Sequence, residues 1–408
     1  MAATMTYQYS VRDRNGKLVS GKIEADSTAA VAQKLKSMGY APVSISESGG
    51  AGMKTELKLP SMGAKVKLKD LAVFSRQFAT MINAGLSLLR SLSILEEQTE
   101  NKELAKVLGD VRQDVETGQS LSASLAKHPR IFPPLMVNMT RAGEVGGFLD
   151  SVMLQIAENY EAEVKLRGKV KSAMTYPVVV FCIAILAVVG MLLFIVPVFA
   201  SMFITLGGEL PAPTKILILM SNVLKKGAPI FVVLAFVGIF FWQKYKHTEK
   251  VRRFVDPLKL KAPVFGQLFQ KIALSRFARN LGTMLQSGVP ILQSLDIVSE
   301  TTGNTVVGDA VLDIQTSVRN GESITGPLAG HAVFPPMVVQ MMAVGEDTGA
   351  LDAMLHKISE FYDQEVEATT EALTALIEPL MIAALGGIIG SMIIALYMPI
   401  FKIFDLIK

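Results

Sequence analysis

A pair of carboxylates in a glycine-rich stretch is the part of this sequence best suited to bind a ligand. Glu144 and Asp150 lie six residues apart, around Gly143 and Gly147. The same four residue types return at Gly345, Glu346, Gly349 and Asp352. Such carboxylates could bind a cation or contact a partner, but acids are also common near helix starts, where they cap N–H groups. We therefore expect a structural turn in which the acids cap the next helix, with the cation site or partner contact as the alternative.

No other residues have the spacing of a catalytic, nucleotide-binding or metal site. The sequence lacks a Walker A motif, a GxGxxG motif between a strand and a helix, HExxH and GxSxG. The histidines lack metal-ligand spacing, and we expect the equivalent His128 and His331 to cap helices or lie on the surface. The single cysteine, Cys182, allows no disulfide within the chain. We expect no metal, no cofactor and no enzymatic activity, and a net charge of +4 is too small to indicate nucleic acid binding.

An internal duplication identifies the elements that position the repeated turn. The stretch Phe132 to Asp150 recurs as Phe334 to Asp352, with Phe-Pro-Pro, Gly-Glu and Leu-Asp retained. Further upstream, Phe74 to Leu95 matches Phe277 to Val298. The repeated unit has about 135 residues, whereas solenoid repeats have roughly 20 to 50. The pattern therefore indicates a duplicated domain.

Each copy begins with a helical region. Between Leu68 and Lys171, apolar residues follow the spacing of amphipathic helices. Gly85 is placed to end one helix, and Pro133 with the proline that follows it opens another, which we expect Gly143 to close. The last helix is expected to begin near Phe148. The pattern predicts an antiparallel bundle of about six helices with short loops.

Two arginines occupy equivalent positions in the two copies, on helices that are otherwise apolar. They are Arg76 and Arg279. Each could pair within its own bundle or point at a partner protein, and the sequence is compatible with both.

Three apolar stretches are suited to cross a membrane. Ser172 to Thr205 contains no charged residue, and its core has about 20 residues, enough to cross about 30 Å of hydrocarbon. The second stretch is Ala228 to Trp242, which apolar residues from Ile216 could extend, and the third is Pro379 to Phe401. Their interiors carry no charge, which argues against an ion-coupled transporter.

Small residues recur along one face of the third stretch. They are Ala383, Gly387, Ser391 and Ala395, with Gly386 and Gly390 forming a GxxxG motif. Such a face allows helices to approach closely, so it predicts tight packing within the chain or between subunits.

Basic residues beside the first two stretches indicate the orientation. The first is preceded, and the second followed, by clusters that belong in the cytoplasm. The clusters are Lys165, Arg167, Lys169 and Lys171, and Lys244, Lys246, Lys250, Arg252 and Arg253. The N-terminus and both bundles are then expected in the cytoplasm, and the C-terminus outside.

The segments that lead into the first and third stretches carry opposite charge. The first is basic, whereas the other carries Asp363, Glu365, Glu367, Glu371 and Glu378. Because an exposed ion pair contributes only about 0 to 1 kcal/mol, ordinary solvated charge is one interpretation. The other is that these two segments, which we call the stems, lie side by side and attract each other just inside the membrane.

Ahead of the duplication lies a small α/β pattern. Tyr7 to Val11 and Leu18 to Glu24 predict a β-hairpin with a turn at Asp13 to Gly16. A helix that Asp26 or Ser27 could cap, running to about Met38, and a strand from Pro42 to Ser46 follow.

The whole chain is thus expected to be a mainly α polytopic membrane protein. It has two duplicated cytoplasmic antiparallel helical bundles, three transmembrane helices and a small N-terminal α/β module. The expected divisions are the module at 1–48, a linker at 49–67, bundle one at 68–172, a span at 173–204, a periplasmic loop at 205–227, a span at 228–243, bundle two at 244–372, a span at 373–403 and a periplasmic tail at 404–408.

The duplicated FPP…GExxGxLD pattern with three apolar stretches resembles the type II secretion F / type IV pilus platform family, the PilC-like proteins. The resemblance covers essentially the whole chain and includes the stretches FSRQFATMINAG, FARNLGTMLQSG and LGGELPAPT. It implies a non-enzymatic assembly platform in the bacterial inner membrane, beneath a growing pilus or pseudopilus.

The resemblance also implies partners. These are a hexameric cytoplasmic assembly ATPase, a retraction ATPase in a pilus machine, pilins or pseudopilins, other inner-membrane components and further copies of the chain, but no nucleic acid. Arg76 and Arg279 then become candidates for facing the ATPase. Pilus assembly is the preferred function, type II secretion is the alternative within the family, and a transporter or channel is the alternative outside it.

Overall fold

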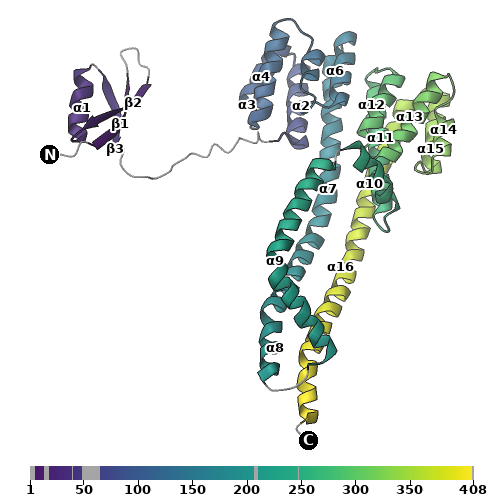
Figure 1. The fold of residues 1–408 in the computed structure, drawn as a ribbon. Helices are drawn as coiled ribbons and strands as arrows, with labels where there is room; N and C mark the ends of the chain where they lie inside the picture. The colour runs from purple at the N-terminus through teal and green to yellow at the C-terminus, as the bar shows by residue number, and fades with distance from the viewer. Residues whose placement is uncertain are drawn as a thin grey trace. The chain divides into compact units, whose positions relative to one another are not determined.

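The computed structural model describes residues 5–12, 18–38, 40–47, 65–205, 210–246 and 248–406. The chain divides into two compact units, Met1–Met62 and Gly63–Lys408, which are described separately (Figure 1). The expected hairpin turn at Asp13 to Gly16 and most of the expected linker lie outside the described residues.

The first unit contains a three-stranded antiparallel sheet and one helix. Its central strand is β1, with β2 on one side and β3 on the other. The helix begins after Ser27, whose side chain accepts a hydrogen bond from the Ala30 amide. Tyr7, Val11, Val31 and Leu35 form the small core. The elements are β1 (Met5–Arg12), β2 (Leu18–Ala25), α1 (Thr28–Ser37) and β3 (Ala41–Glu47).

The second unit contains the two copies of the helical repeat (Figure 1). Copy one comprises α2 (Leu68–Asn83), α3 (Leu88–Gln98), α4 (Lys102–Glu116), α5 (Leu121–Ala126), α6 (Pro134–Gly146) and α7 (Leu149–Gly190). Copy two comprises α11 (Gly266–Gln286), α12 (Ile291–Thr301), α13 (Thr305–Arg319), α14 (Thr325–Gly330), α15 (Pro336–Thr348) and α16 (Leu351–Leu406). Gly85 and its counterpart Gly288 follow α2 and α11 with φ of 83° and 69°, a conformation that suits glycine.

The repeated glycines Gly143 and Gly345 do not end helices, contrary to the sequence prediction. The helices α6 and α15 continue past them and end at Gly147 and Gly349, which adopt left-handed conformations. Gly143 is buried inside α6, and a Cβ there would lie 3.1 Å from Leu149 Cα. The inner glycine therefore allows the next helix to pack closely, and the outer one makes the turn.

One hydrophobic core extends through both copies. It includes residues from every helix of the two repeats and is organised in each copy around paired phenylalanines. The ring of Phe132 lies 5.9 Å from that of Phe74, and the ring of Phe334 lies 5.1 Å from that of Phe277. The Phe-Pro-Pro motif thus places one aromatic ring in the core and opens the following helix with proline.

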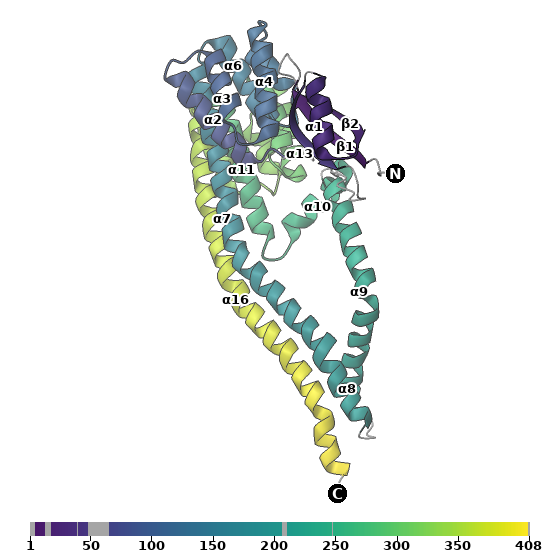
Figure 2. The ribbon, with the colours of Figure 1, turned by 90° about the vertical axis from the view of Figure 1, so that its left-hand side faces the viewer.

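Two long helices continue from the bundles into apolar segments. The helix α7 passes through a π-helical turn, η1 (Met191–Ile195), into α8 (Val196–Thr205), and α16 is continuous over 56 residues. Both are long and apolar enough to cross a membrane. Figures 1 and 2 show that α7 and α16 lie side by side below the bundles.

The region between these helices differs from the sequence prediction. The segment 205–227 was expected to be a loop, but it is helical from Ala212. The helix α9 (Ala212–Tyr245) contains both this part and the second apolar stretch. This helix is bent by 63° between Ala228 and Ile230. If its two parts together form one span, the chain has three helices able to cross a membrane. An additional helix, α10 (Glu249–Lys261), which the sequence did not predict, then packs against α11 and α13.

Candidate functional site

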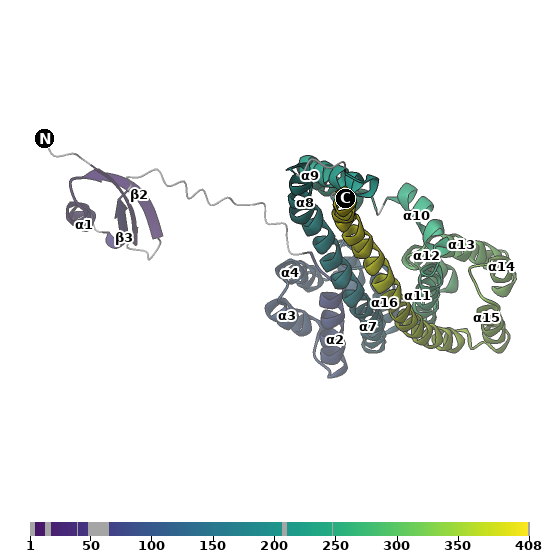
Figure 3. The same cartoon turned by 90° about the horizontal axis from the view of Figure 1, so that it is seen from below.

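The two copies meet along a polar seam, which we define as the facing surfaces of α7, α11 and α16 (Figure 3). Within this seam, Glu163 of α7 forms ion pairs with three arginines. The Arg276 Nη2 and Arg167 Nε atoms each lie 2.6 Å from Glu163 Oε1, and the Arg279 Nη1 atom lies 3.8 Å from Oε2. The side chain of Glu163 is only 12% exposed, so these interactions are shielded from solvent.

The protonation of Glu163 reflects a competition between burial and charge. Burial raises its pKa, but the attraction and hydrogen bonds of Arg276 and Arg167 lower it more, so the pKa lies below the ordinary value for glutamate. The carboxylate is therefore charged at neutral pH and holds α7 against α11.

Arg279 is the buried member of the repeated arginine pair. Its side chain is 7% exposed, and its Nη2 forms an ion pair with Asp363 and donates to Ser275 Oγ at 3.2 Å. Arg279 is thus largely buried among these groups, and a contact between it and a partner remains a prediction. Arg279 connects α11 to α16.

The equivalent arginine in copy one is more accessible. Arg76 forms two hydrogen bonds with Glu161, of 2.7 and 2.5 Å, and these two side chains are 37% and 44% exposed. Glu161 and Asp363 are equivalent positions, so the same pair connects the first and last helix of each bundle. A contact between Arg76 and a partner remains a prediction.

Uncharged polar groups extend the seam toward the repeated turns. Asn159 donates to Asn280 Oδ1 at 3.3 Å, and Ser287 donates to Gln155 Oε1. Outside the seam, Gln293 of α12 donates to Asn138 Oδ1 of α6 at 2.7 Å, which adds another contact between the copies. Hydrogen bonds of this kind, which are buried or partly buried, fix the relative position of two surfaces more strictly than apolar contacts do.

Toward the membrane the seam becomes a contact between stems. Lys169 of α7 forms an ion pair with Glu367 of α16, and Lys271 Nζ lies 2.7 Å from Glu365 Oε2. Arg167 does not follow the expected pairing with the acidic stem, since its partner Glu163 is four residues earlier on the same helix. Lys169 and Glu367 therefore form a direct ion pair between the two stems, as the predicted attraction requires. Apolar side chains lie between the stems at Leu166, Leu268, Val366 and Leu373.

The repeated acids have two separate roles. Glu144 accepts hydrogen bonds from the backbone amides of Leu121 and Ser122, and Glu346 does so from Ile324 and Thr325. These amides begin α5 and α14, so each glutamate caps the preceding short helix and not the next one. Asp150 and Asp352 lie in the first turns of α7 and α16, as predicted for acids at helix starts. Within the residues that the structure describes, no group of acids, histidines or cysteines could hold a metal ion.

The small-residue face of α16 is buried within the chain only near its end. Ala395 is buried, and its carbonyl accepts a hydrogen bond from Thr214 Oγ1 at 2.5 Å. A Cβ added at Gly386, Gly387 or Gly390 would meet nothing within 4 Å, and Ala383 and Ser391 are exposed. The predicted close packing is thus absent inside the described part of the chain at these glycines, and packing between subunits remains a prediction.

Sequence reasoning missed Glu163, Arg276 and Asp256. Asp256 of α10 is buried, accepts from the Thr305 amide at 3.2 Å and pairs with Lys259. The duplication could have identified the pairing of Arg76 with Glu161, because both positions recur with conserved charge. Glu163 recurs as Glu365, but Arg276 corresponds to Val73, so comparing the copies does not reveal that Glu163 and Arg276 pair with each other.

The fold and the seam define a class of protein: a duplicated pair of helical bundles that share one core and continue into apolar spans. Comparison with known families agrees with this architecture. Residues 74–197 and 277–399 each match the family described as "Type II secretion system (T2SS), protein F", and residues 1–46 match its N-terminal domain. The chain belongs to this family.

Individual relatives align over nearly full length. "Type IV pilus assembly protein PilC" of Thermus thermophilus is 46% identical, over 97% of this chain and 98% of the relative. The protein of the same name from Myxococcus xanthus is 42% identical, over 98% and 95%. "Type II secretion system protein F" of Aeromonas hydrophila is 30% identical, over 94% and 99%.

Proposed function

We propose that this protein is the inner-membrane platform of a type IV pilus assembly machine. It acts without catalysing a reaction itself and couples a cytoplasmic assembly or retraction ATPase to the insertion of pilin subunits into the fibre. The observation that favours a pilus over secretion is the graded identity: 46% and 42% to relatives named for pilus assembly, against 30% and 31% to relatives named for type II secretion.

The geometry suggests how such coupling works. The helices α7 and α16 begin at the repeated turns and continue as single rods into the apolar segments. At 1.5 Å per residue, the 56 residues of α16 extend over about 80 Å. A force on either bundle therefore reaches the membrane through a stem, and the shared core and seam make the bundles move together.

The proposed arrangement places both bundles and the N-terminal module in the cytoplasm. Three spans follow from the two long apolar helices together with α9. Further copies of the chain and other machine components would pack against the exposed small-residue face of α16, which cysteine cross-linking in membranes would detect.

Deleting the gene tests the function. Loss of this protein should abolish surface pili and pilus-dependent motility, while the isolated assembly ATPase still hydrolyses ATP at its normal rate. Secretion of folded enzymes should be unaffected. If pili persist and secretion stops, the alternative function as the F-type platform of a type II secretion system is correct.

A further inference from the structure

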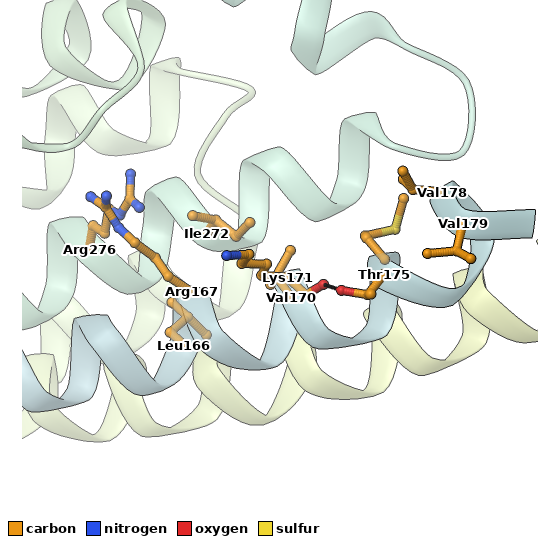
Figure 4. Close-up of a pocket in the computed structure, with 10 residues that line it drawn as sticks. Leu166, Arg167, Val170, Lys171, Thr175, Val178, Val179, Ile272 and Arg276 are labelled. Carbon is orange, nitrogen blue, oxygen red and sulfur yellow. Dashed lines mark hydrogen bonds between the residues drawn. The ribbon is translucent and has the colours of Figure 1, made fainter. Parts of the chain in front are cut away.

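A groove of about 700 Å³ lies between α7 and α11 where the stem approaches the membrane (Figure 4). Its walls come from four turns of α7, from Leu166 to Val179, and from one face of α11. Lys171 is the last charged residue before the uncharged stretch from Ser172 to Thr205. The groove therefore begins among charged groups and ends within the apolar segment.

The charged end of the groove is entirely basic. Arg167, Lys171 and Arg276 line it, and no acid does. Glu163, next to the groove, pairs with both arginines, so one carboxylate is shared by two of the three cations. In the part of the chain that the structure describes, no ion pair engages Lys171. This end consequently complements an anion.

The other end of the groove is apolar. It is lined by Met174, Val178 and Val179, while Val170 and Ile272 lie beside the cationic groups. From Arg167 to Val179, α7 rises by about 18 Å, at 1.5 Å per residue. In Figure 4 Arg276 and Arg167 lie toward one end, Val178 and Val179 lie toward the other, and Lys171 lies between them. A ligand that fills this groove needs a compact anionic group joined to a long apolar portion.

We propose that this groove binds an anionic phospholipid of the cytoplasmic leaflet. Basic pockets between helices at the cytoplasmic face of a membrane bind anionic headgroups, and the stem enters the membrane at this level. The phosphate contacts Lys171 and Arg167, and an acyl chain lies along Met174 and Val178. A purely apolar helix would leave Lys171 without an ion-pair partner, whereas a phospholipid satisfies both ends.

Native mass spectrometry of the full-length protein in detergent tests the proposal. Phosphatidylglycerol or phosphatidylcholine is added to the delipidated protein, and the bound lipid is quantified. The wild type should prefer phosphatidylglycerol. Lys171→Gln should weaken that binding about fivefold, as expected for the loss of one cation near an anionic surface. The matched control is Lys165→Gln, which removes another exposed lysine of the same helix that does not line the groove.

A second variant tests the apolar end without changing charge. Met174→Trp fills the groove and should reduce binding of phosphatidylglycerol, whereas Ile183→Trp, on an exposed position outside the groove, should not. Equal binding of the two lipids, or equal losses in Lys171→Gln and Lys165→Gln, would overturn the proposal. So would a Met174→Trp protein that keeps its lipid but no longer retains a co-purified pilin, because the groove would then be a protein-docking site.

Discussion

Glu163 shows how one residue can join two copies of a duplicated domain. It lies on the last helix of copy one, and two of its three arginines belong to copy two. Its side chain is nearly buried, whereas Glu161, two positions earlier, is 44% exposed and pairs within its own copy. Of these neighbouring acids, Glu161 connects two helices of one bundle, and Glu163 connects the two bundles to each other.

Removing the charge of Glu163 should loosen the seam. Glu163→Gln leaves Arg276 without its carboxylate and should lower the free energy of unfolding by about 3 kcal/mol, the typical cost of breaking a buried ion pair. Thermal unfolding of the full-length protein in detergent measures this as a lower midpoint. The control, Glu161→Gln, breaks a half-exposed pair and should cost no more than about 1 kcal/mol. Equal effects of the two variants would contradict the central role of Glu163.

The contribution of Glu163 should also depend on pH in a defined direction. Because its pKa is lower in the folded protein, its stabilisation is complete above the unfolded pKa of about 4.3. The stabilisation is lost as the pH falls through the folded pKa. The midpoints of the wild type and Glu163→Gln should therefore differ at pH 7 and converge as the pH falls through the lowered pKa of Glu163 in the folded protein. A constant difference down to the lowest accessible pH would argue against this linkage.

At the scale of elements, the stems α7 and α16 combine apolar and charged contacts. Leu166 and Val366 are buried between them, and Lys169 pairs with Glu367 beside this apolar strip. Both charged side chains are about 40% exposed, so the ion pair contributes little to stability. Its expected role is to favour one alignment of the stems.

Exchanging the two charges tests this alignment. Lys169→Glu or Glu367→Lys alone places like charges together and should reduce pilus assembly, whereas the double exchange should restore much of it. Counting surface pili by electron microscopy measures the effect, with immunoblots of membranes to confirm equal protein levels. The control exchange is Lys357 with Glu360, an exposed pair within α16. A double variant no better than either single variant would exclude the pairing.

At the scale of the whole molecule, the duplication restricts how the chain crosses the membrane. The two copies are built alike, so both bundles are expected on the same side. An odd number of additional spans must then return the chain between them, and α9 is the segment available for this.

The topology can be measured with reporter fusions. A periplasmic reporter should be active after Gly208 and after Lys408 and inactive after Lys261, because the basic residues around α7 and α10 retain the bundles in the cytoplasm. A cytoplasmic reporter gives the complementary pattern in the same constructions. Cytoplasmic activity of the fusion after Lys408 would show an even number of spans and contradict the proposed arrangement.

Local sequence patterns predicted much of the fold. Gly85, Ser87 and the paired prolines marked helix ends correctly, because each acts on the backbone within a few residues. The position of the turn after α6 was wrong by four residues. Two glycines were available there, and only packing shows that Gly143 is the one pressed against α7.

By itself the sequence determined the duplication, the apolar stretches and the opposite charges of the stems, because composition and spacing along the chain carry these features. Only the tertiary structure decided how the two copies join. Glu163 has a partner four residues away in Arg167, but Arg276 is separated from it by 113 residues. Such a contact depends on how two folded surfaces meet, and no local pattern encodes that.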